Sequence, residues 1–425
     1  MDAHRSATTL VPEQRRHPVT LLSSRSRSAT DPGWLHERTL RLAEAVLTHR
    51  SALLDILTET ATRTAAEDEI NRSVRALAGA AWEVARNGPP RTGRLAVFLP
   101  SNNVLYSYVL FGLIPSLYCD EIVIRPSART RATAFAVHAL LATTCGPRVM
   151  ERVRLVEESQ RTFQATCADA DAVVFTGQYD NGLEVMGKIG DRPLFLLFGS
   201  GPNPMIVGPQ AAAERTTRAM LTSRLYNSGQ DCLCSDLIFV HRSHLDAVVD
   251  DLKIALSAVR TAGRRSPGAV VAPLVYADAA EQAEKYISDH AEQVVFGGHA
   301  DARTLRVDPT IVLHDRSQQL HPPEFFSPIF CLAPYEDPSE IESWAFSPYE
   351  LSRGMYASVF GEQRIDSRRL GTARVLRELT TFDHEDGNRP FGGYGPQAGA
   401  VRGPDGRLQA RPLLLSAELA TRGSR

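Results

Sequence analysis

The stretch DAVVFTGQYDNG, residues 171–182, decides the fold class. Its first half is a short apolar run rich in valine, which is typical of a strand that is buried on both faces. The run ends at Gly177, and a second glycine, Gly182, follows five residues later near an expected helix start. Because a strand that turns through glycine into a helix is the repeating unit of a parallel sheet, these residues predict an α/β fold.

The same rhythm continues on both sides of this stretch. Apolar residues recur at helical spacing from Trp34 to about Asn87. Further strands are expected at 95–100, 121–126, 153–157, 237–241 and 293–298. Helices are expected at 104–117, 130–142, 210–226, 243–260 and 278–292. The pattern predicts a doubly wound parallel sheet followed by a second α/β unit.

Length and composition limit the class of protein. A chain of 425 residues exceeds what one hydrophobic core serves, so at least two domains are expected. The net charge of -2 favours neither nucleic acid nor a membrane surface as partner, and no apolar run is long enough for a transmembrane helix. Six scattered cysteines fit neither a disulfide framework nor a structural zinc site, so we expect no metal and a cytoplasmic location.

The first 33 residues differ in composition from the rest. They are rich in Arg and Ser and contain no apolar segment of the kind that directs secretion. A disordered tail is the expected structure, and a transit peptide is the alternative.

The segment NSGQDC, residues 227–232, is the first candidate for chemistry. It is a polar run between an expected helix and an expected strand, where loops often present reactive groups. Cys232 is the candidate nucleophile, although a buried cysteine that only packs is the ordinary alternative. Cys234 either resolves an oxidised Cys232 or, as we favour, packs in the strand.

Three more segments are candidates for ligand contact. The turn at 177–182 leaves backbone N–H groups free for a phosphate, but it matches neither GxGxxG nor a P-loop, and an ordinary turn is the alternative. On their own, EFFSP at 324–328 indicates a turn with a buried aromatic, and PFGGYG at 390–395 indicates a flexible loop.

In their order along the chain, these segments resemble the aldehyde dehydrogenase superfamily from about Trp34 to residue 415. LPSNN at 99–103 looks like the family's PWN segment, and FTGQYDNG at 175–182 looks like its FTGSTEVG segment. YNSGQDC at 226–232 resembles the nucleophile motif. Further matches follow in register at IRPSART (124–130), GSGPNPMIV (199–207), VDPTIV (307–312), EFFSPIF (324–330) and PFGGYG (390–395).

The resemblance implies a fold and a set of site residues. A Rossmann-type cofactor domain would span 34–204, an α/β catalytic domain 205–398, and a C-terminal segment 399–425, which could add an edge strand in a homodimer. Cys232 would be the nucleophile, and the Asn102 amide with the Cys232 backbone N–H would form the oxyanion hole. The cofactor, NAD or NADP, would be bound by Arg125, Ser127, Gly177, Gln178, Gly182, Glu324 and Phe326.

Two departures from the family narrow the expected function. Leu196 stands where the family has the general-base Glu that activates water, and no acidic residue occurs from Pro193 to Gln210. A thiol acceptor needs no such base, so we expect an aldehyde and an acyl thioester, bound to coenzyme A or a carrier, to be interconverted. Ala128 stands where members that prefer NAD often have Glu, which makes NADP plausible.

Two alternatives stay open at this point. One is a hydrolytic aldehyde dehydrogenase that uses another base, for which Asp231, His241 and Glu184 are the nearest candidates in sequence. The other is a non-catalytic relative that binds a cofactor or a partner. The joint presence of Cys232, Asn102 and Glu324 argues against this second alternative.

Overall fold

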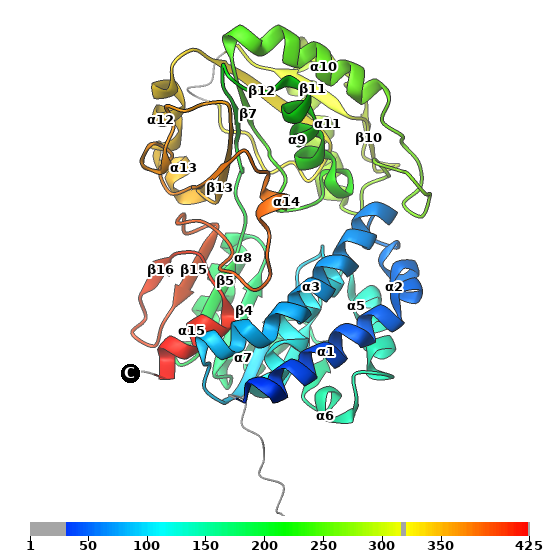
Figure 1. Cartoon of the computed structure of the whole chain (residues 1–425), viewed down its shortest axis with the longest axis vertical. Helices are drawn as coiled ribbons and strands as arrows, with labels where there is room; N and C mark the ends of the chain where they lie inside the picture. The colour runs from blue at the N-terminus through cyan, green and yellow to red at the C-terminus, as the bar shows by residue number, and fades with distance from the viewer. Residues whose placement is uncertain (1–30, 316–319, 424–425) are drawn as a thin grey trace, which may run out of the picture.

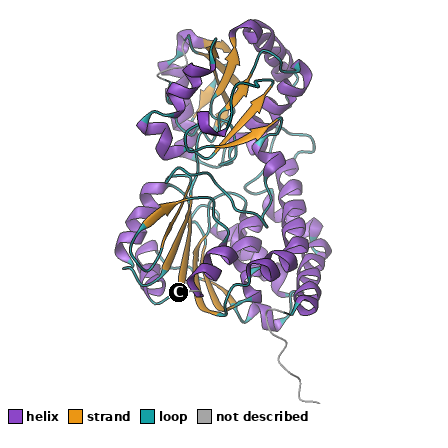
Figure 2. Cartoon of the chain, turned by 60° about the vertical axis from the view of Figure 1, so that its left-hand side comes forward, coloured by secondary structure: helices purple, strands orange, loops and turns teal. Residues whose placement is uncertain are grey.

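The computed structural model describes residues 31–315 and 320–423 and arranges them in two lobes, each built on a seven-stranded sheet (Figures 1 and 2). The expected N-terminal tail lies outside the described residues up to residue 30. No helix within the described ranges is long and apolar enough to cross a membrane.

Three helices precede the first strand: α1 (Pro32–Thr48), α2 (Arg50–Leu57) and α3 (Arg63–Asn87). They confirm the helical spacing expected from Trp34 to Asn87. Helix α1 begins slightly before the predicted end of the tail because Asp31 caps its first backbone N–H groups. Helix α3 starts on a Thr62 cap and ends at Gly88, whose φ of 60° is the left-handed conformation that glycine tolerates best.

The first sheet is doubly wound, as predicted. Its strands are β1 (Thr92–Phe98), β2 (Cys119–Arg125), β3 (Val153–Leu155), β4 (Ala172–Thr176), β5 (Leu194–Phe198), β15 (Gly399–Arg402) and β16 (Leu408–Ala410). The order is β16-β15-β5-β4-β1-β2-β3, with β1 to β5 parallel. The helices between its strands include α5 (Arg131–Ala142), α6 (Pro147–Met150), α7 (Gln160–Ala168) and α8 (Tyr179–Lys188).

The strand order predicts a binding crevice between β1 and β4. The connections leaving β1 and β4, which are neighbours in the sheet, run in opposite directions along it, toward β2 and toward β5. Ligands bind at such a switch point, outside the carboxyl ends of the strands. Because β1 ends at Phe98 and β4 at Thr176, the segments 99–103 and 177–182 both lie at this point.

The helix predicted at 104–117 is not continuous. It consists of α4 (Val104–Tyr108), a π-helical turn (Val109–Leu113) and a 3-10 turn (Pro115–Leu117). The Ile114 N–H bonds to the Val109 carbonyl five residues back, and Pro115, which has no N–H, prevents a regular continuation.

The second sheet forms the other lobe. Its order is β14-β13-β6-β7-β12-β11-β8, with only β8 antiparallel to its neighbour. The strands are β6 (Met205–Val207), β7 (Ile238–His241), β8 (Val294–Phe296), β11 (Thr310–Leu313), β12 (Ile329–Tyr335), β13 (Tyr356–Phe360) and β14 (Arg374–Arg377). A small ribbon pairs β9 (Ala300–Asp301) with β10 (Arg306–Val307). The helices are α9 (Ala213–Leu225), α10 (Leu245–Ser257), α11 (Ala277–Asp289), α12 (Pro338–Ala345), α13 (Pro348–Arg353) and α14 (Thr381–His384).

The C-terminal segment differs from its prediction. Its strands β15 and β16 extend the first sheet beyond β5, so the chain returns to the cofactor lobe after building the other lobe. The edge strand in this segment is β16, whereas the run RPLLLSAEL at 411–419, which also suggested one, leads into α15 (Leu415–Gly423), which buries Leu415 and Leu419 and contacts α3. A homodimer stays a prediction.

Candidate active site

Most of the predicted site residues line one cavity of about 910 Å³. It is lined by the segments that follow β1 and β4 and by the Cys232 loop and Glu324 of the other lobe. The predicted residues that line it are Asn102, Arg125, Ser127, Gly177, Gln178, Cys232, Glu324 and Phe326. Gly182 is the exception. A Cβ there would lie 2.5 Å from Leu197 Cδ1, so this glycine lets α8 pack closely on β5 instead of touching a ligand.

The loop before Cys232 has an unusual backbone. Asn227, Ser228 and Gly229 have φ values of 48°, 62° and 84°, in the left-handed region. Their neighbours hold them there: the Asn227 side chain accepts a hydrogen bond from Thr62 N at 2.9 Å, and Ser228 Oγ accepts one from Ala272 N at 2.9 Å. The polar residues in this loop therefore shape the backbone and place Cys232.

The Asn203 side chain holds the Cys232 loop in place by hydrogen bonds to its backbone. It is fully buried, and its Nδ2 donates to the carbonyl oxygens of Cys232 at 2.7 Å and Cys234 at 3.2 Å. Cys234 is itself buried, which raises the pKa of its thiol far above the usual range. The burial is consistent with the interpretation of Cys234 as a packed residue.

Cys232 is half-buried among carboxylates. Burial raises the pKa of its thiol well above the ordinary value, and the nearby Asp231, Glu324 and Glu385 carboxylates raise it further. Burial and these negative charges therefore favour the protonated thiol over the thiolate.

Two hydrogen-bond donors at the cavity, the Asn102 amide and the Cys232 backbone N–H, have no partner among the described residues. Asn102 Nδ2 is buried and donates to no residue in the described ranges. The Cys232 backbone N–H likewise donates to none of them. Free donors beside a nucleophile suit an oxygen that gains negative charge, which is the role the sequence predicts for this pair.

The cofactor end of the cavity starts at the turn after β4. Gly177 has a φ of 148°, and the helix that follows begins at Tyr179 without a side-chain cap from Gln178. The first N–H groups of such a helix are unpaired and attract an anion. These residues therefore fit the pyrophosphate of a dinucleotide.

The remaining predicted cofactor residues line the same end. Ser127 Oγ lies 2.7 Å from Ser101 Oγ, and Arg125 Nε donates to the Glu158 carbonyl at 3.0 Å. Burial raises the pKa of Glu324 to about 7. Phe326, with a φ of 45°, packs edge-on against Tyr276 at a centroid distance of 6.1 Å.

Strand β5 provides an apolar wall. Leu196 is fully buried in the middle of the strand and does not line the cavity. Phe198 lies two residues further on the same face, and it does line the cavity. The side chain that β5 presents to the cavity is therefore Phe198. Like Leu196, it has no group that could activate water.

Of the three general-base candidates named from the sequence, only Asp231 lines the cavity. His241 and Glu184 do not line the cavity; His241 bonds to Ser243 and Glu184 pairs with Lys188. Asp231 does line it, but its oxygens accept from Asn103 Nδ2 and Leu233 N.

Sequence reasoning missed Glu385. This carboxylate lines the cavity and accepts a hydrogen bond from the Tyr106 hydroxyl at 2.9 Å. The two residues are 279 positions apart, so no local sequence pattern could have indicated the pair.

Comparison with known proteins places this site in context. A model described as the aldehyde dehydrogenase family matches residues 37–399. The mitochondrial aldehyde dehydrogenase of Leishmania tarentolae is 26% identical over 393 residues, which cover 86% of this chain and 78% of that protein. Succinate-semialdehyde dehydrogenase [NADP(+)] 1 of Schizosaccharomyces pombe is 27% identical over 53% of this chain. The chain spans about half the length of this relative and of two other curated aldehyde dehydrogenases that match it similarly.

A solved structure supports the fold independently. Glyceraldehyde-3-phosphate dehydrogenase GapN of Methanocaldococcus jannaschii, complexed with NADP, superposes with a TM-score of 0.75. The superposition covers 90% of each chain at 18% identity, so it shows a common fold.

Proposed function

The chain belongs to the aldehyde dehydrogenase family, and we propose that it is an NAD(P)-dependent oxidoreductase that interconverts an aldehyde and an acyl thioester through Cys232. The observation that carries this proposal is the meeting of Cys232, the two free donors and the uncapped start of α8 in one cavity. A nucleophile, an oxyanion site and a dinucleotide site are the parts that this chemistry needs.

In the oxidative direction, the Cys232 thiol first loses its proton to solvent, and its Sγ then attacks the aldehyde carbon to form a thiohemiacetal anion. Asn102 Nδ2 and the Cys232 N–H hold the oxygen while it is negative. A nicotinamide dinucleotide held here would supply the acceptor for the hydride on this carbon, which would leave Cys232 as a thioester. Glu324 and Phe326 line the cavity, where they would hold the ribose and the ring of the dinucleotide.

The apolar β5 wall favours a thiol as the second substrate. Attack by water on a thioester needs a base, and Leu196 and Phe198 cannot supply one. A thiol is already partly ionised near neutral pH, so its thiolate attacks the acyl carbon and releases Cys232 without such help. The acceptor would be coenzyme A or a carrier-bound thiol.

One observation favours hydrolysis as a second candidate. Glu385 lies in the cavity close enough to Cys232 to raise its pKa, and burial raises the pKa of Glu385 itself. A carboxylate with a raised pKa is a better base, so Glu385 is the group that would activate water if the product were a carboxylic acid.

The adenosine end favours NADP over NAD. Ala128 lines the cavity without the carboxylate that would repel a 2′-phosphate, and Arg125 and Arg129 line it nearby. Arg129 also pairs with Asp278 at 2.9 Å.

The decisive experiment follows NAD(P)H absorbance with purified protein and a small panel of aldehydes, with and without coenzyme A. Turnover that requires the thiol and is abolished in Cys232→Ala supports the proposal. Turnover without any thiol, lost in Glu385→Gln, establishes the hydrolytic candidate instead. The absence of turnover under both conditions would count against an aldehyde substrate.

A further inference from the structure

The half of the cavity beyond Cys232 carries an excess of acidic side chains. We propose that it selects an aldehyde or acyl chain whose far end bears a positive charge, such as an amine or a quaternary ammonium. This inference rests on the proposed function and adds to it the substrate class.

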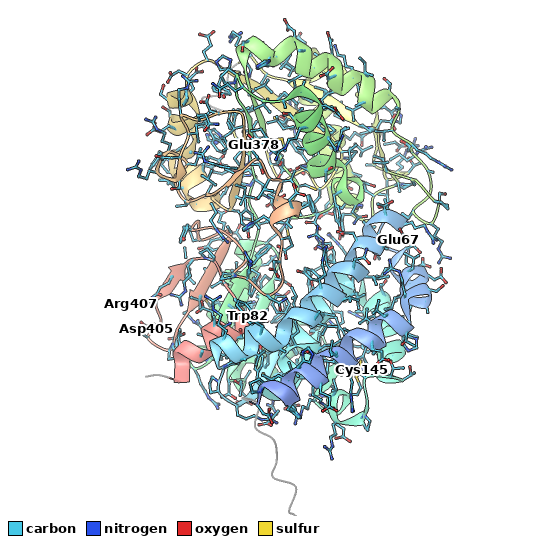
Figure 3. The ribbon with its side chains drawn as sticks, viewed as in Figure 1. Glu67, Trp82, Cys145, Glu378, Asp405 and Arg407 are labelled. Atoms are coloured by element: carbon cyan, nitrogen blue, oxygen red, sulfur yellow. The ribbon has the colours of Figure 1, made fainter. Side chains whose placement is uncertain are left out.

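The substrate end is defined here as the part of the cavity lined by α3, by the segment 106–118 and by the segments 382–391 and 413–415. Helix α3 runs along its whole length. Figure 3 labels Glu67 at the end of α3 nearer the second lobe and Trp82 at the opposite end, beside α15. The wall between these ends is apolar and aromatic: Tyr106, Leu110, Phe111, Tyr118, Phe391 and Leu413.

Two acids project from α3 into this end. Glu69 and Glu83 are each only 3% exposed, and both line the cavity. They are fourteen residues apart, which is about 21 Å along a helix. Glu69 accepts hydrogen bonds from Leu105 N and Tyr106 N, and Glu83 accepts one from Ser416 Oγ. Neither forms an ion pair with any residue that the structure describes.

Glu385 is a third acid, and it lies nearest to the reacting sulfur. Within the described ranges its one hydrogen-bond partner is the Tyr106 hydroxyl, and Arg72 is close enough for its charge to favour the carboxylate form. The Glu385 carboxylate is one of the charges that raise the pKa of the Cys232 thiol, whereas Glu83 stands near the C-terminal end of α3, so a short substrate would meet Glu385 and a long one would reach Glu83.

The two arginines at the substrate end each form an ion pair with an aspartate. Arg72 pairs with Asp68 at 2.5 Å and donates to the Phe382 carbonyl. Arg389 pairs with Asp386 at 3.1 Å. Among the residues that the structure describes at this end, each arginine is therefore already balanced by one carboxylate, and Glu69, Glu83 and Glu385 remain in excess.

Charge and shape together favour a cationic group. Largely buried carboxylates are stabilised by a positive charge and repel a negative one more strongly than they would in water. The Tyr106, Phe111 and Phe391 rings add aromatic faces, which attract ammonium groups. An acidic aldehyde, such as the one for which the Schizosaccharomyces pombe relative is named, would lack a partner.

The test uses aldehydes of matched shape. 4-Trimethylammoniobutanal and 5,5-dimethylhexanal differ only in the charge of one central atom, and succinic semialdehyde supplies the opposite charge. We expect kcat/KM to be at least about tenfold higher for the cation than for the neutral aldehyde, and lowest for the anion. Glu385→Gln or Glu83→Gln should reduce the ratio between cation and neutral aldehyde. Glu184→Gln, which removes an exposed acid outside the cavity, should leave that ratio unchanged.

The outcomes separate this inference from the proposed function. Turnover of the neutral aldehyde as fast as the cation overturns the inference and leaves the function standing. If no aldehyde reacts, the function fails, and the inference is decided by calorimetry with the corresponding alcohols on the Cys232→Ser protein. Tighter binding of 4-trimethylammonio-1-butanol than of 5,5-dimethyl-1-hexanol supports the inference, and equal binding overturns it.

Discussion

Arg224 and Asp236 form a fully buried ion pair, with Nη1 and Oδ1 2.5 Å apart, that joins the nucleophile loop to the nicotinamide side of the cavity. Arg224 also donates to the Gly229 carbonyl at 2.8 Å, and Asp236 Oδ1 accepts from Phe325 N at 3.1 Å. One pair of charges thus connects the segment before Cys232 with the residue after Glu324. The position of the proposed nucleophile relative to the proposed cofactor residue Glu324 depends on this pair.

The first prediction concerns this ion pair. Arg224→Met leaves the Asp236 carboxylate buried without its partner, which should destabilise the protein by about 3–5 kcal/mol. The double variant Arg224→Met/Asp236→Leu should recover much of that loss, because no buried charge remains. Urea unfolding of the three proteins measures both effects. A double variant less stable than the single one would contradict this account.

The second prediction concerns the reactivity of Cys232. Because nearby carboxylates and burial raise the pKa of this thiol, iodoacetamide should label it slowly at neutral pH in the free protein. The oxidised nicotinamide ring is positively charged and should favour the thiolate, so labelling should accelerate with NAD(P)+ and not with NAD(P)H. Mass spectrometry of the labelled peptide gives the rates, and equal rates with both cofactor forms would refute the electrostatic argument.

The third prediction concerns the oxyanion donor. Asn102→Ala removes a free amide that we propose binds the reacting oxygen, so kcat should fall by about 10²–10³ while KM changes little. Asn71→Ala is the matched control, since Asn71 is an exposed amide bonded to Arg50 outside the cavity. Steady-state kinetics decide the matter; a change confined to KM would mean that Asn102 only binds the substrate.

The sequence predicted the fold, and it predicted most of the segments that meet in the cavity, because their signals are local. A strand, a glycine turn and a helix start follow one another within residues 171–182, and NSGQDC is one loop. The substrate end could not be predicted in the same way. Glu385 meets Tyr106 only through tertiary packing, and counting residues along β5 pointed to Leu196 while the pleat of the strand presents Phe198 to the cavity.

The fourth prediction concerns the choice of cofactor. With Ala128 and two arginines at the adenosine end, KM should be lower for NADPH than for NADH. Ala128→Glu adds the missing carboxylate and should raise KM for NADPH at least about tenfold while affecting NADH less. Ala128→Gln, which has similar size and no charge, separates repulsion from crowding. A clear preference of the unmodified protein for NADH would reject the prediction.

The fifth prediction concerns the stability effect of Glu83. Burial raises the pKa of this carboxyl to about 7, with only the Ser416 hydrogen bond acting against the shift, while Asp386 adds to it and Tyr118 packs nearby. A group whose pKa is raised on folding stabilises the protein below its ordinary pKa of 4.5, and this contribution is lost as the pH rises through 7.

The ionised form therefore costs up to about 3 kcal/mol above neutral pH. Glu83→Gln keeps the oxygen that Ser416 bonds and cannot ionise, so the variant should be more stable than the unmodified protein at pH 8 and about equal to it at pH 5. Urea unfolding at the two pH values measures the difference. A difference that does not grow with pH would mean that Glu83 stays neutral, or is already paired, in the folded protein.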